Sequence, residues 1–253
     1  MKKDPIQTLK KFYQIIHRKS GFLYMPPREV CIITGCPRSG TTAMLKWLAK
    51  SGQTAIFHEP RICKAVSDFM DKIYRQKPLY ADKDLLLHLL KRLLYGYFSH
   101  QNNIWNKIIV VKETLSLGDD NFIENMSSLF LKVKIIFMVR HPVSVFNSME
   151  KRKWGVSIRN SEPWDMPLDT GIKWWKFTVN NYLKNKNNNL YLCVFENLIK
   201  NPESESAKIK KFLKIKRLET FHVENTARID LDKDIIQTIL NETQTECELL
   251  NYI

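Results

Sequence analysis

Residues 35–42 read Gly-Cys-Pro-Arg-Ser-Gly-Thr-Thr and follow directly on the apolar run 30–34. A glycine-containing turn between a strand and a helix is typical of phosphate-binding loops, because its backbone N–H groups and the helix N-terminus both attract anions. We therefore expect this segment to bind a phosphate-bearing cofactor. The residues expected to bind it are Pro37, Arg38, Ser39, Gly40, Thr41 and Thr42.

Position 41 indicates which kind of nucleotide the loop binds. In loops that bind nucleoside triphosphates, a lysine before the final Ser/Thr reaches the β and γ phosphates, and the hydroxyl holds magnesium. Here Thr41 stands at the lysine position, and the cation of the loop is Arg38. The loop is therefore predicted to bind a nucleotide without a γ phosphate.

A second anion motif follows about a hundred residues later. The apolar strand predicted at 135–139 ends in Arg140, where a triphosphatase would carry a metal-supporting aspartate. Arginine is a phosphate ligand. Pro142 fits the first turn of a following helix, so Ser148 lies about two turns from the Arg140 corner. Arg140 and Ser148 can thus bind one anion together.

The two segments resemble the sulfotransferases that use 3′-phosphoadenosine-5′-phosphosulfate, with the soluble bacterial-type branch as the best match. In that family a Pro-x-x-Gly-Thr-Thr loop binds the 5′-phosphosulfate, and an Arg-x-Pro segment with a later serine binds the 3′ phosphate. Softer matches at 190–199, 212–213 and 247–252 extend the resemblance over residues 28–252. The resemblance implies this donor, 3′-phosphoadenosine 5′-phosphate as product, no metal, and a small-molecule or glycan acceptor.

Sulfuryl transfer to a hydroxyl needs a proton acceptor and cations beside the sulfuryl oxygens. Glu59 is the candidate general base, because residues 57–60 (Phe-His-Glu-Pro) resemble a Phe-Glu-Pro segment found in several branches of the family. His58 is the rival base, but strand alternation points it to the other face. Arg38 and Lys112 are the candidates for electrostatic stabilisation. A surface carboxylate at Glu59 and a solvated lysine at Lys112 are the alternatives.

The elements that must position these residues alternate along the chain. Strands are predicted at 30–34, 53–58, 107–112, 135–139 and 190–195, and helices at 41–51, 62–76, 83–99 and 169–184. This order predicts an α/β fold, a P-loop-like three-layer sandwich with a central parallel β-sheet flanked by helices. The chain is interpreted as a single domain, 1–253, with a basic lead-in helix in 1–27 and the core in 28–253. Residues 152–168 are predicted to be a mobile loop near the site.

Strand ends place Glu59, Lys112 and Arg140 around one crevice, since ligands of such sheets bind outside the carboxyl ends of the strands. Of the adjacent Trp174 and Trp175, one is expected in the core, and the other is a candidate for the acceptor pocket. The regions 61–100 and 151–168 are expected to set acceptor specificity.

The five cysteines show no CxxC pair, which favours a reducing compartment over disulfides or zinc, and no metal-ligand cluster is visible. Cys36 lies in the phosphate loop, where the helix N-terminus can favour its thiolate, but a spacer role is the favoured interpretation. The residues at 1–7 include no signal-peptide core and no stretch is long enough to span a membrane, so a cytoplasmic protein is predicted.

The net charge of +14 suits a phosphate-rich cofactor as well as a nucleic acid. Because the cations are spread along the chain without interleaved aromatics, no nucleic-acid partner is predicted. Two other functions stay open: a P-loop kinase or other phosphotransferase with an aberrant loop, and a non-catalytic nucleotide- or RNA-binding module. The oligomeric state is also open, with a homodimer as one alternative.

Overall fold

The computed structural model describes residues 29–75, 83–101, 107–130, 132–152, 167–222 and 228–252. The predicted lead-in helix in 1–27 and most of the predicted loop at 152–168 lie outside the described residues. Both stay predictions, as does the assignment of the whole chain to one domain.

A parallel sheet of five strands forms the centre of the protein, in the order β2-β3-β1-β4-β5. Its strands are β1 (Val30–Gly35), β2 (Thr54–His58), β3 (Ile108–Lys112), β4 (Val133–Val139) and β5 (Leu190–Val194). Parallel neighbours require a crossover connection, which helices supply here. All five predicted strands are confirmed, with small differences at their ends.

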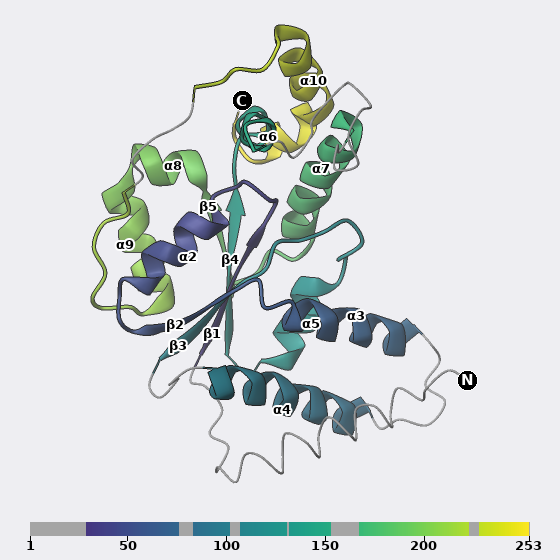
Figure 1. Ribbon diagram of the computed structural model, residues 1–253, viewed down its shortest axis with the longest axis vertical. Coiled ribbons are helices and arrows are strands. Elements are labelled where there is room, and N and C mark those ends of the chain that lie inside the picture. The colour runs from purple at the N-terminus through teal and green to yellow at the C-terminus, as the bar shows by residue number, and fades with distance from the viewer. Residues whose placement is uncertain are drawn as a thin grey trace.

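Helices cover both faces of this sheet (Figure 1). One face packs against α2 (Thr41–Ala49), α8 (Phe195–Lys200) and α9 (Pro202–Leu213). The opposite face packs against α3 (Ile62–Arg75), α4 (Lys83–Gln101), α5 (Phe122–Leu129), α6 (Pro142–Glu150), α7 (Leu168–Lys184) and α10 (Lys233–Leu249). The predicted three-layer α/β sandwich is therefore confirmed. Among the described residues, no helix combines the length and apolar character needed to cross a lipid bilayer.

Alternation along the strands divides the core into two layers. In β1, Cys31 and Ile33 pack on the α2 side, while Val30 and Ile32 pack on the other side. Successive side chains of a strand point to opposite faces, so a strand covered on both faces is apolar throughout. The uninterrupted apolar run at 30–33 follows from this burial and holds β1 at the centre of the sheet.

Gly35 ends β1 where the chain leaves the sheet for the phosphate loop. Its φ is 140°, and a Cβ at this position would lie 2.2 Å from the carbonyl oxygen of Met138 in β4. A residue with a side chain would force β1 and β4 apart. The glycine thus allows both strands to deliver their ends to one site.

Candidate active site

The phosphate loop lies between β1 and α2, as predicted. Gly40 is the N-cap of α2 with a φ of 92°, and no side chain caps the helix. The N–H groups of the first helical turn have no intrahelical partners, so they are available to an anion. The Ser39 hydroxyl is buried and has no hydrogen-bond partner in the structure. These donors fit a phosphate or a phosphosulfate.

The two anion motifs of the sequence meet in space. Arg140 Nη1 donates to the carbonyl oxygen of Arg38 at 3.3 Å, and Arg38 Nε donates to Ser148 Oγ at 3.1 Å. The guanidinium of Arg140 lies 4.9 Å from the ring centroid of Phe195, a cation–π contact that orients it. A Cβ on Gly40 would approach the same Phe195 ring to 2.4 Å. The loop, Arg140 and Ser148 therefore form one group.

This group concentrates positive charge. Burial, together with the charges of Arg152 and Arg140, lowers the pKa of Arg38. Burial also lowers the pKa of Arg140, although the carboxylate of Glu196 acts in the opposite direction. Arginine stays charged despite such shifts, and the buried Nε of Arg140 has no partner. An anion with several oxygens would satisfy these donors and relieve the repulsion.

A network of hydrogen bonds around Glu196 holds Arg140 in place. The sequence had not assigned a role to Glu196 or Tyr252. Glu196 accepts hydrogen bonds from the His141 backbone N–H and from the Tyr252 hydroxyl, both at 3.0 Å. Trp175 Nε1 donates to the carbonyl oxygen of Arg140 at 3.0 Å. The sequence matches at 190–199 and 247–252 contain Glu196 and Tyr252, so these matches could have identified the network from the sequence.

A second group forms at the ends of β2 and β3. The Glu59 backbone N–H donates to the carbonyl oxygen of Lys112 at 2.9 Å, and the Lys112 ammonium forms an ion pair with the Glu59 carboxylate. The Lys112 side chain is buried, with 6% of its surface exposed. A charge this deeply buried requires such a partner. The structure thus brings together the predicted base and the predicted lysine.

Glu59 is an ionised carboxylate in this arrangement. Partial burial raises its pKa, but the hydrogen bond and charge of Lys112, with smaller effects from His58 and Arg61, outweigh burial and hold the pKa below its ordinary value. The backbone of Glu59 has a φ of 47° and that of Arg61 a φ of 55°. Residues with side chains adopt these angles at a cost, and such strain clusters at functional sites.

His58 is exposed at the end of the edge strand β2, whereas its neighbour Phe57 is buried. Strand alternation ends here, because Glu59 lies beyond β2 in a left-handed conformation. His58 does not line the cavity beside Glu59. Its role as the weaker candidate base stays a prediction.

An open cavity of about 470 Å³ lies beside Glu59. Its polar lining comprises Glu59, Arg61, Lys64, Asp68, Glu113, Thr114 and Ser116. The volume falls within the usual range of small-molecule sites. Part of the lining belongs to the region 61–100, which was expected to set acceptor specificity. Such a polar wall suits a hydrophilic acceptor.

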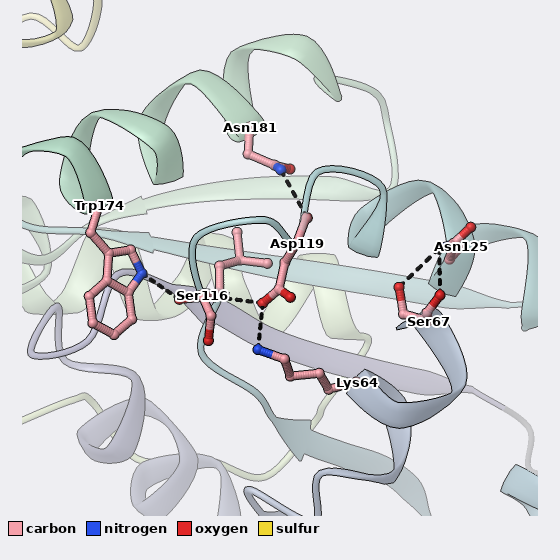
Figure 2. Close-up of polar contacts among 8 residues, drawn as sticks. Lys64, Ser67, Ser116, Asp119, Asn125, Trp174 and Asn181 are labelled. Atoms are coloured by element: carbon pink, nitrogen blue, oxygen red, sulfur yellow. Dashed lines mark hydrogen bonds and ion pairs between the residues drawn. The ribbon is translucent and has the colours of Figure 1, made fainter. Parts of the chain in front are cut away.

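Asp119 fixes the loop that forms one wall of this cavity (Figure 2). Its carboxylate accepts hydrogen bonds from the Ser116 backbone N–H at 2.6 Å and from Lys64 Nζ at 3.1 Å. Asn181 Nδ2 donates to the Asp119 carbonyl oxygen at 3.3 Å. These bonds tie the loop after β3 to α3 and α7, so the wall keeps its shape.

Trp174 braces the same loop, since its Nε1 donates to the carbonyl oxygen of Leu115 at 2.7 Å (Figure 2). It does not appear in the lining of the cavity, and Trp175 is buried in the core. The Leu115 N–H in turn donates to the carbonyl oxygen of Gly35 at 3.2 Å. This bond joins the cavity wall to the start of the phosphate loop.

Glu113 is the residue of this site that sequence reasoning overlooked. It follows Lys112 directly, is 4% exposed, and its Oε1 is buried without a partner. Burial raises the pKa of Glu113 to about 7. A backbone hydrogen bond from Arg61 lowers this pKa, and the charge of Glu59 raises it. A second carboxyl after a strand-end lysine was visible in the sequence, but its burial was not.

Cys36 is buried in the loop, and this burial raises the pKa of its thiol, which agrees with the spacer role favoured for it. The helix N-terminus cannot compensate for the loss of water around a charged sulfur. All five cysteines are buried and free. Among the described residues, no cluster of three His, Cys, Asp or Glu is arranged to hold a metal ion.

Comparisons with known proteins agree with this geometry. A family model described as "Sulfotransferase family" matches residues 31–219. The sulfotransferase domain of the Synechococcus PCC 7002 olefin synthase is 15% identical and has a TM-score of 0.58, over 92% of this chain and 99% of that domain. The sulfotransferase domain from the curacin biosynthetic pathway gives 17% identity and a TM-score of 0.58, over 91% and 99% of the two chains.

The sulfotransferase from Alicyclobacillus acidocaldarius is similar too, with 15% identity and a TM-score of 0.53, over 90% of this chain and 97% of that chain. Identities this low support a shared fold and nothing finer. No curated protein matches the chain.

Proposed function

This chain belongs to the sulfotransferase family, and on that basis we propose that it transfers the sulfuryl group of 3′-phosphoadenosine-5′-phosphosulfate to a hydroxyl or amine of a small-molecule or glycan acceptor. The reaction is an in-line displacement with 3′-phosphoadenosine 5′-phosphate as the second product. The transfer needs no metal, because guanidinium and ammonium groups supply the positive charge.

The observation that carries the proposal is the group of Arg38, Arg140 and Ser148 beside the N-terminus of α2. The donor carries anions at two places, the 5′-phosphosulfate and the 3′ phosphate. The loop N–H groups and the Ser39 hydroxyl suit the first, and Arg140 with Ser148 suits the second. A nucleoside triphosphate would leave Arg140 and Ser148 without a function.

The catalytic roles follow from the second group. The cavity beside Glu59 holds the acceptor, and the ionised Glu59 carboxylate takes the proton of its reacting hydroxyl. Lys112 and Arg38 stabilise the negative charge that develops on the sulfuryl and bridging oxygens. The five buried, free cysteines support a reducing compartment, and hence the cytoplasm, as the place where the protein works.

Calorimetry tests the choice of nucleotide. We expect 3′-phosphoadenosine 5′-phosphate to bind without magnesium and at least about tenfold more tightly than AMP, because only the former offers a 3′ phosphate to Arg140 and Ser148. ATP with magnesium and a single-stranded RNA in low salt serve as comparison ligands for the phosphotransferase and RNA-binding alternatives. Equal affinity for the two adenosine nucleotides would remove the 3′-phosphate assignment.

Substitutions in the Arg140 site test the same assignment residue by residue. Arg140→Ala should weaken binding of 3′-phosphoadenosine 5′-phosphate by on the order of 1.5–3 kcal/mol, and Ser148→Ala by less, because a charged hydrogen bond is stronger than a neutral one. Arg217→Ala is the matched control, since Arg217 is exposed and lies after α9. If Arg140→Ala binds the nucleotide like the Arg217 variant, the 3′ phosphate is bound elsewhere.

A further inference from the structure

Two carboxyl groups with opposite properties line the cavity beside Lys112. Glu59 is ion-paired to Lys112, and that contact lowers its proton affinity. Glu113 has a buried oxygen, Oε1, without a hydrogen-bond partner. An unpaired buried acceptor atom in a cavity wall is satisfied by a ligand that donates a hydrogen bond. A hydroxyl or amine of the acceptor is such a donor.

The position of Glu113 is fixed by the backbone rather than by its own side chain. Its N–H donates to the carbonyl oxygen of Ile33 at 3.0 Å, just before the phosphate loop begins at Gly35. Leu115, two residues later, bonds to Gly35 itself. Glu113 is therefore carried by the same strand ends that carry the loop, at the same edge of the sheet.

We propose that Glu113 is a second catalytic carboxyl of this site, which binds the acceptor through its free oxygen and receives the proton that Glu59 takes from the reacting hydroxyl. The inference rests on the proposed function. As the acceptor oxygen bonds to sulfur, its O–H bond breaks and the proton goes to the carboxyl pair. The bond from sulfur to the bridging oxygen breaks, and the phosphate leaves with its electron pair.

The environment of Glu113 explains why the proton ends there. The charged or titratable groups around it are Glu59, Arg61, Cys63, Lys64, Asp68 and Lys112. Lys64 is paired with Asp119, and Lys112 with Glu59, so both cations have other carboxylates as partners. Burial is the largest effect and raises the pKa of Glu113 to about 7. A base is most effective when its pKa lies near the working pH.

The pH dependence of donor consumption tests the proposal without a known acceptor. Hydrolysis of 3′-phosphoadenosine-5′-phosphosulfate, with water as the acceptor, should be about tenfold faster at pH 8 than at pH 6 in the wild type, because Glu113 must be ionised to accept the proton. Glu113→Gln should lower the rate at pH 8 by at least about tenfold and remove this dependence. Glu124→Gln, an exposed carboxyl on α5, is the matched control and should keep the wild-type profile.

Melting temperatures give a readout that does not depend on activity. In the unfolded chain Glu113 ionises at the ordinary glutamate pKa, whereas in the folded protein burial raises the pKa to about 7. The folded state therefore loses stability as the pH rises between these values, and Glu113→Gln removes that loss. The variant should melt higher than the wild type at pH 8 and close to it at pH 5.

The outcomes separate the inference from the proposed function. A wild type that hydrolyses the donor at the same rate at pH 6 and pH 8, or a Glu113→Gln variant that keeps the rise, overturns the role of Glu113. A melting difference that is equal at the two pH values also overturns it. A wild type that neither binds 3′-phosphoadenosine 5′-phosphate nor consumes the donor contradicts the proposed function instead.

Discussion

Glu59→Gln is expected to lower turnover by about two to four orders of magnitude, the usual size of general-base assistance, while cofactor affinity stays close to that of the wild type. Glutamine keeps the shape of the side chain and its ability to accept a hydrogen bond from Lys112, but it cannot take a proton. Lys112 is buried, so the loss of its charged partner should lower the melting temperature of this variant. Steady-state turnover with labelled donor measures the first effect, and calorimetry measures the second.

His58→Ala is the comparison for this experiment. His58 is exposed on the edge strand and does not line the cavity, so its removal should reduce turnover far less than Glu59→Gln does. Full turnover in Glu59→Gln together with an inactive His58→Ala would reverse the two roles. The chain would then resemble the histidine-dependent branch of the family.

The strands and the anion motifs were readable because their signals are local. An apolar run such as 30–34 implies a buried parallel strand, and a glycine-rich turn after it implies an anion site. The rule that strand ends share one edge of the sheet was applied to Glu59, Lys112 and Arg140, whereas the contact of Arg38 with Ser148 is seen only in the structure. Helix α5 was not predicted, because it is one short element whose stability comes from packing on the sheet rather than from its own sequence.

The properties that could not be predicted all depend on burial. The sequence places Glu113 beside Lys112 but does not show that its side chain is removed from water, which is the largest cause of its raised pKa. Burial acts on Cys36 in the same direction, since it raises the pKa of the thiol and disfavours the thiolate. Glu196 was visible as a motif match, but its bond to the His141 N–H appears only once β4 and β5 are adjacent.

Lys112→Met is expected to reduce turnover by about two to three orders of magnitude, the effect usually seen when one donor that stabilises transition-state charge is removed. Methionine fills a similar space in the buried site, so the loss reports charge rather than packing. The substitution also removes the hydrogen bond and the charge that hold the pKa of Glu59 down, so that pKa should rise toward its ordinary value.

The double variant Glu59→Gln with Lys112→Met decides whether the two residues work as a unit. Because their side chains are in contact, their effects should not add, and the double variant should be about as slow as the slower single variant. Circular dichroism of each variant checks that the fold is retained. Fully multiplicative losses would show that Lys112 acts on the sulfuryl group independently of Glu59. A folded Lys112→Met variant with wild-type turnover would reduce Lys112 to a structural partner of Glu59 and remove it from the catalytic site.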